Sequence, residues 1–200
     1  MKYRPKLIRF IFIAASLCIT FSAYGVEGYT KFDTKGLSKA KGLWLTVKYP
    51  SNWLAKDGER PNIVQKFVHN DGPITELLMV QIKDVPKEAA KELPLLTEND
   101  WVEVLSDIGA GAKVSGVKKI RHEGQPGFIG NVKLVEERAG LSLYQNQRVL
   151  SIFYKNSIIF LWCGTSSTTA NSALVNTVQE RNSQGVCHQF FNSLVLMDRY

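Results

Sequence analysis

Apolar and polar residues alternate with a period of two in several segments of this chain. The alternation first appears over residues 43–49, which are followed by Pro50, and it returns over 63–69. Segment 75–85 carries apolar residues on both of its faces, which is typical of a central strand. Because successive side chains of a strand point to opposite faces, this period predicts half-buried β-strands.

Four more segments have the same strand character and follow one another closely. Short turns separate them, such as Glu123-Gly124-Gln125-Pro126 and Lys155-Asn156. Consecutive strands with tight turns predict an antiparallel meander. The four segments are 113–121, 127–137, 141–154 and 157–164.

Helical spacing appears in two places. Trp101, Val104, Leu105 and Ile108 lie at i, i+3, i+4 and i+7 after Thr97, which predicts an amphipathic helix. Segment 86–97 is charged and proline-bounded, and we expect a short helical turn there. In the last third, the capping residues of 166–172 precede one helix, and a second helix carries an apolar face over 187–195. Strands followed by helices in this order predict an α+β fold.

The first 25 residues have the pattern of a secretory signal peptide. Four basic residues surround the start of an apolar run over 7–21, which ends at Ala23-Tyr24-Gly25, with small residues where signal peptidase reads. A retained membrane anchor is the alternative, but the apolar run is short and no stop-transfer charges follow it. A lipoprotein site at Cys18 is disfavoured because Leu17 stands where a small residue is needed. We therefore predict cleavage after Gly25 and a secreted or periplasmic protein.

Cleavage changes the domain organisation and the charge. The remaining 175 residues (200 − 25) suit a flexible, polar lead-in over 26–41 and a single domain over 42–200. The net charge of +7 falls to +3, because 21 Lys and Arg then face 18 Asp and Glu. A polyanion partner is not implied, and we expect no binding to nucleic acid. The basic residues of 113–121 are interpreted as a solvated strand face or a sheet edge, although a nucleic-acid or lipid patch is conceivable.

Two cysteines remain after cleavage, Cys163 and Cys187. In an exported protein, two cysteines most simply form one disulfide. Free or metal-binding thiols are the alternative, but the pair has no CxxC spacing. Cys163 shares a strand face with Ile159 and Leu161, and Cys187 lies on the apolar face of the last helix. The bond would therefore hold that helix on the sheet.

Catalytic motifs fail when their spacing is checked. His122-Glu123 begins like the zinc-protease motif, but Pro126 stands where the second histidine is required. No G-x-S-x-G occurs, and His188 is interpreted as a surface residue of a helix. We predict no catalytic residue, no metal ligand and no cofactor.

The best candidate for a binding surface is a charged loop that borders Trp53. It would act as a contact surface or a weak cation site. One alternative is a hydrolase whose site assembles from His69, Asp57 and Ser51, and another is a small-ligand or metal-binding module at the sheet edge near Trp53. The candidate surface consists of Trp53, Asp57, Glu59, Arg60 and His69.

The sequence resembles a known family in two motifs. Residues 42–53, GLWLTVKYPSNW, resemble the first strand and the Y-P-x-x-W turn of PsbP-like proteins, whose fold is shared with the Ran-binding nuclear import factor Mog. Phe190 to Leu194, FFNSL, resembles the Phe-rich end of their last helix. The resemblance covers residues 42–196 and implies an α/β/α sandwich, with helices flanking a central, mainly antiparallel sheet of about six or seven strands. It also implies an exported bacterial member that binds or scaffolds, and it transfers no functional residue.

These observations together predict an exported, non-enzymatic binding or interaction protein. We expect it in the periplasm or secreted onward, including as an effector, with another protein as its partner. After signal cleavage we expect no stable insertion into a membrane. The sequence does not set the oligomeric state.

Overall fold

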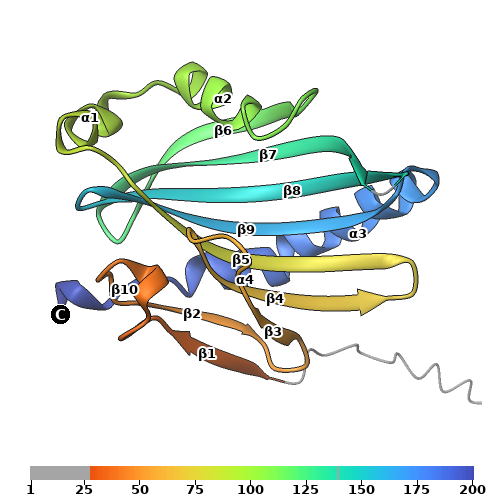
Figure 1. Ribbon diagram of the computed structural model, residues 1–200, viewed down its shortest axis with the longest axis horizontal. Helices are drawn as coiled ribbons and strands as arrows, with labels where there is room; N and C mark the ends of the chain where they lie inside the picture. The colour runs from red at the N-terminus through yellow and green to blue at the C-terminus, as the bar shows by residue number, and fades with distance from the viewer. Residues whose placement is uncertain (1–27, 139) are drawn as a thin grey trace, which may run out of the picture.

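Two antiparallel sheets form the centre of the molecule in this computed structural model, which describes residues 28–138 and 140–200 (Figure 1). The predicted signal peptide and its cleavage site lie outside the described residues. All six strands predicted between residues 63 and 164 are present, in one sheet. In spatial order its strands are β3 (Leu54–Asp57), β4 (Ile63–Asp71), β5 (Ile74–Asp84), β9 (Ser157–Thr168), β8 (Leu141–Tyr154), β7 (Gln125–Arg138) and β6 (Lys113–His122).

The smaller sheet corrects the predicted lead-in. It contains β1 (Tyr29–Asp33), β2 (Leu45–Pro50) and β10 (Val195–Leu196), in the order β1–β2–β10. The prediction of a flexible segment over 26–41 was wrong for its described part, because every residue of β1 pairs with β2. Thr34 is buried and its hydroxyl donates to the carbonyl oxygen of Leu43 at 2.8 Å, which fixes the chain after β1.

Helices cover both faces of the larger sheet. On one face lie α1 (Lys87–Glu92) and α2 (Glu98–Ser106), and on the other lie α3 (Ser172–Gln184), α4 (Val186–Asn192) and the smaller sheet (Figure 1). The layers confirm the expected α+β sandwich with a mainly antiparallel central sheet flanked by helices. Four short 3₁₀ helices connect these elements at Ser38–Ala40, Leu93–Leu95, Thr169–Asn171 and Met197–Arg199.

The core under α2 is aromatic. Trp101 is buried, and its ring centroid lies 5.2 Å from that of Phe128 and 5.3 Å from that of Phe153. The predicted apolar face of this helix is half right. Trp101 and Leu105 are buried, but Val104 and Ile108 are exposed, and Ile108 lies beyond the end of the helix at Ser106.

The second core lies between the larger sheet and α4, and it contains the predicted disulfide. Cys163 on β9 and Cys187 on α4 are bonded, with their Cα atoms 5.5 Å apart. Both cysteines are buried among apolar residues, including Leu161 and Phe190. The bond therefore ties the last helix to the centre of the sheet, as the sequence predicted. Trp53 is also buried in this core.

Candidate functional site

A row of polar side chains crosses the larger sheet beneath α3. His69 on β4 lies opposite Glu76 on β5, Glu76 lies opposite Thr165 on β9, and Thr165 lies opposite Asn146 on β8. Partners in a register share one face of the sheet, so the four side chains form a continuous line. The line marks the border of the second core, because Leu78 and Cys163, the next pair on this face, are apolar and buried.

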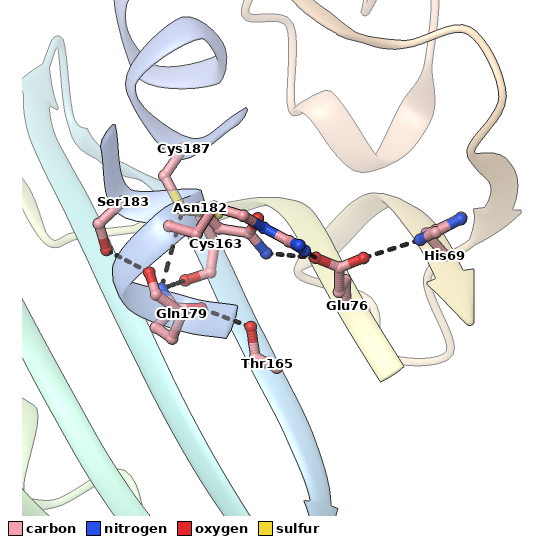
Figure 2. A network of polar contacts seen from close by, with 9 residues as sticks. His69, Glu76, Cys163, Thr165, Gln179, Asn182, Ser183 and Cys187 are labelled. Atoms are coloured by element: carbon pink, nitrogen blue, oxygen red, sulfur yellow. Dashed lines mark hydrogen bonds and ion pairs between the residues drawn. A yellow bond between two sulfur atoms is a disulfide. The ribbon is translucent and has the colours of Figure 1, made fainter. Parts of the chain in front are cut away.

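Glu76 is the centre of this row. Its side chain is only 5% exposed, and its carboxylate has three partners. The Nδ1 atom of His69 lies 2.7 Å from Oε2, the Nδ2 atom of Asn182 donates to Oε1, and the Nη2 atom of Arg181 lies 3.6 Å from Oε1. Figure 2 shows His69 and Asn182 on opposite sides of the carboxylate. Because an ionised carboxylate only accepts hydrogen bonds, Nδ1 is the protonated nitrogen of His69 in this pairing.

Side-chain amides attach α3 to the sheet. The Oε1 atom of Gln179 accepts from the Thr165 hydroxyl at 2.7 Å, and its Nε2 atom donates to the Cys163 carbonyl at 3.1 Å (Figure 2). Asn176 accepts from the Asn146 side chain at 2.8 Å. Asn176, Gln179 and Asn182 are spaced by three residues, so one polar stripe of the helix meets the polar row. These amide residues are not apolar, so hydropathy did not predict that this side of α3 packs on the sheet. Their repeat every three residues could have predicted the contact.

Trp53 and His69 close the outer end of the row. Their rings stack with centroids 5.7 Å apart and planes inclined by 15°. Trp53 is buried, whereas the side chain of His69 is 35% exposed and that of Arg181 is 67% exposed. The surface next to the buried carboxylate therefore presents the free edge of an imidazole and a guanidinium group. We call Trp53, His69 and Arg181, with Glu76 beneath them, the His69 site.

The structure divides the predicted binding surface into two places. Trp53 and His69 lie together, as described above. Glu59 pairs with Lys66 at 2.7 Å, and Glu59 and Arg60 border a surface hollow of about 400 Å³. Ser38, Lys39 and Pro61 complete the lining of that hollow. Asp57 is exposed on β3, opposite Gln65.

Sequence reasoning missed Glu76, Arg181 and Asn182. The signal for Glu76 was present, because it shares its strand face with Leu78 and Val80, which are fully buried. A carboxylate on an apolar strand face needs buried partners. Arg181 and Asn182 had no comparable signal, since their roles depend on where α3 meets the sheet.

The residues of the predicted hydrolase site are not assembled. The Ser51 hydroxyl accepts from Thr30 at 2.9 Å, and His69 bonds to Glu76. Trp53, which stacks on His69, directly precedes β3, whereas Asp57 is the last residue of that strand. Over the described ranges, no hydrogen bond joins any two of Ser51, Asp57 and His69, and no hydroxyl group bonds to the His69 ring.

The described part of the chain also lacks a metal cluster. Within residues 28–138 and 140–200, no three His, Cys, Asp or Glu side chains are placed to hold one ion. His69 and Glu76 alone offer two ligands. A search of the same residues finds no helix with the length and apolarity needed to cross a bilayer.

Comparison with known proteins gives little further information. No protein-family model matches the chain, and no curated protein matches it. A similar solved structure is the crystal structure of LpqN, described as involved in cell envelope biogenesis of Mycobacterium tuberculosis. It is 10% identical with a TM-score of 0.43, over 84% of this chain and 90% of the LpqN chain. We infer nothing from so distant a likeness, and the resemblance to PsbP-like and Mog-like proteins stays a prediction.

Proposed function

We propose that this protein is exported, loses residues 1–25, and acts as a non-enzymatic binding protein in the periplasm or after onward secretion. Its partner is another protein, which contacts the His69 site. The observation that carries this proposal is the stacking of His69 on Trp53 while the same ring bonds to the buried Glu76 carboxylate.

Preorganisation supports binding at this place. A side chain already held in one position loses little further entropy when a partner docks. The His69 ring is held on its face by Trp53 and on its Nδ1 edge by Glu76. When the His69 ring is neutral with its proton on Nδ1, the Nε2 atom accepts a hydrogen bond, and the Arg181 guanidinium donates. The site thus fits a partner that offers a donor and a carboxylate or carbonyl oxygen side by side.

The same geometry supports binding over hydrolysis. A histidine oriented by a carboxylate becomes a catalytic base only when a nucleophile lies within hydrogen-bonding reach of its other nitrogen. Ser51, the serine of the predicted hydrolase site, accepts a hydrogen bond from Thr30 instead. His69 and Glu76 therefore serve here to build a rigid surface.

The disulfide supports export. Such bonds persist in oxidising compartments and are rare where thiols are kept reduced. Cell fractionation and intact-mass measurement test this part of the proposal. We expect protein that begins at Val26 in the periplasm or medium, and full-length protein retained in the cytoplasm would contradict export.

Partner capture tests the His69 site. Mature protein is used as bait against periplasmic extract, medium and host-cell lysate, and captured proteins are quantified by mass spectrometry. We expect one partner that the double variant His69→Ala/Arg181→Ala recovers about tenfold less well. His188→Ala is the matched control, because His188 is an exposed histidine on α4 that contacts Asn192. Equal recovery by all three baits would remove the His69 site from the proposal.

Activity assays complete the test. Ester, peptide and phosphate substrates are offered to the mature protein and to His69→Ala. We expect no turnover above background with either protein. Turnover by the mature protein that disappears in His69→Ala would show that the protein is an enzyme.

A further inference from the structure

Part of the larger sheet is uncovered on the side where α3 lies. α3 contacts β8 and β9, and α2 contacts β6 and β7 from the opposite side (Figure 1). Val132 and Leu134 of β7 are buried in the core under α2. Because side chains alternate along a strand, Asn131 and Lys133 point to the side of α3, a helix whose main contacts with the sheet are with β8 and β9.

Basic residues dominate this uncovered face. In the register of the sheet, Lys113 lies opposite Lys133, and Ser115 lies opposite Asn131, which in turn lies opposite Arg148. Lys118 follows the β-bulge of β6 and lies on the same face, opposite Ile129. We call Lys113, Lys118, Lys133 and Arg148 the basic strip.

The charges of the strip are not balanced within the described protein. Lys113 and Lys133 are direct cross-strand partners, and like charges in that position destabilise a sheet. None of the three lysines forms an ion pair with a described residue, and Arg148 donates to the Ser183 carbonyl at 3.1 Å. On the same side of the sheet, Glu180 on α3 is exposed, and Glu137 of β7 accepts a hydrogen bond from the Ser142 hydroxyl.

Neutral donors lie between these cations. The side-chain amide of Asn131 makes only a long contact of 3.5 Å with the Ser115 carbonyl, and the Ser115 side chain is exposed. Gly116, in the bulge, has φ +61°, and a Cβ there would come within 3.1 Å of the Asn131 amide. Glycine at this position therefore leaves the amide accessible. Cations and amide donors without an acid among them form a surface that complements negative charge.

We propose that the basic strip binds an acidic segment of a protein partner, with the carboxylates of that segment on the lysines and on Asn131. The shape of the surface favours a polypeptide over a membrane. α3 is a helix about 10 Å across and lies on the sheet beside the strip, so it stands above the strip on that side. A flat bilayer would meet α3 first, whereas an extended acidic segment fits beside the helix. This surface is separate from the His69 site and does not depend on the function proposed for that site.

A labelled oligoglutamate peptide is the probe, and mature protein is titrated into it at low and at high salt. We expect salt-sensitive binding, and we expect Lys113→Gln/Lys133→Gln to weaken it about tenfold. The matched control is Lys87→Gln/Lys91→Gln, which removes the same charge from exposed lysines of α1. That control should stay within about twofold of the unmodified protein. Amide NMR shifts on peptide addition should centre on Ser115 and Asn131.

Each other outcome overturns the proposal. The proposal is wrong if the peptide does not bind. It is also wrong if both double variants lose the same peptide affinity, because that result indicates general charge attraction. Binding to phosphatidylglycerol vesicles through the same lysines, without peptide binding, would assign the strip to a membrane. The NMR map on unmodified protein keeps the test valid if the strip variant misfolds. The peptide titration reports on the basic strip and the partner capture reports on the His69 site, so failure of one inference is distinguished from failure of the other.

Discussion

Glu76 and His69 face each other on neighbouring strands, and their side chains are joined at 2.7 Å within one β-hairpin. The same carboxylate accepts from Asn182, which is 106 positions away in the sequence. One buried acid therefore connects the β4–β5 hairpin to α3. Since a buried charge is costly without partners, this connection fixes where α3 lies on the sheet.

Replacing Glu76 by alanine should destabilise the protein. Asn182 is buried and would lose the acceptor of its side-chain amide. A buried donor left without a partner costs about 1–3 kcal/mol, so we expect the free energy of unfolding to fall by about 2 kcal/mol. Urea unfolding of the mature protein, followed by tryptophan fluorescence, measures the change.

Glu88→Ala is the control for that substitution, because Glu88 is exposed on α1. We expect its free energy of unfolding to stay within about 0.5 kcal/mol of the unmodified protein. Glu76→Gln should lie between the two, since its side chain still offers an oxygen to Asn182. If Glu76→Ala were as stable as Glu88→Ala, the carboxylate would not hold α3 in place.

The sequence predicted the longer strands in which alternate positions are buried. β5 is an example, because alternate positions such as Leu78 and Val80 are buried and give a period of two. β1 and β3 were missed for the opposite reason. Four of the five residues of β1 are exposed, and so are all four residues of β3. Burial therefore imposes no hydrophobic pattern on these two strands. Backbone pairing defines most of these two strands, since Phe32 of β1 packs against the core, and pairing leaves no trace in composition.

The candidate site was predictable only in part. The Cys163–Cys187 bond was predicted from the two cysteines that remain in an exported protein, and the apolar face on which each lies indicated that it joins the last helix to the sheet. Within the predicted binding surface, Trp53 stacks on His69, whereas Glu59 pairs with Lys66, and adjacency to a loop does not predict which side chains meet across strands. The partners of Glu76 come from α3, and no local pattern specifies how a helix with a polar stripe docks.

Removal of the disulfide should lower stability strongly. In the chain-entropy model, closing a loop of about 25 residues stabilises by roughly 3.5 kcal/mol. For a protein of this size we therefore expect Cys163→Ala/Cys187→Ala to melt about 10 °C lower than the unmodified protein. Differential scanning calorimetry of the mature proteins measures the shift.

Reductant provides the control for this prediction. It should lower the melting temperature of the unmodified protein and leave that of the double variant where it is. Alkylation of exported protein without reductant should detect no free thiol at Cys163 or Cys187. Two alkylatable thiols in that sample would refute the bond.

The C-terminal end should make stability depend on pH. Asp198 accepts from the Nζ atom of Lys155 at 2.8 Å, and this hydrogen bond lowers the pKa of Asp198 and raises the pKa of Lys155. A lowered acid pKa stabilises the fold above the ordinary value of 3.8, and the contribution is lost as pH falls through the folded value. A raised lysine pKa stabilises below the ordinary value of 10.5, and the contribution is lost as pH rises through the folded value.

Asp198→Asn tests this window. Between those two ordinary values we expect it to melt about 2 °C below the unmodified protein, a small effect because Lys155 is half exposed. The difference should shrink in stronger acid and in stronger base. Melting curves across the pH range measure it, and a difference that does not vary with pH would show that the ion pair is not its cause.

Gly127 tests the packing of β7 against β8. A Cβ built on Gly127 would overlap the carbonyl oxygen of Ser151 and approach Ile152 Cδ1 to 3.0 Å. Gly127→Ala must displace backbone, so we expect a loss of about 2 kcal/mol in the free energy of unfolding. Gly109→Ala is the matched control, because its Cβ would meet only Leu134 Cδ1 at an ordinary 3.7 Å. Urea unfolding should separate the two variants clearly, and equal stability would mean that β7 and β8 are not as close at this point as the structure places them.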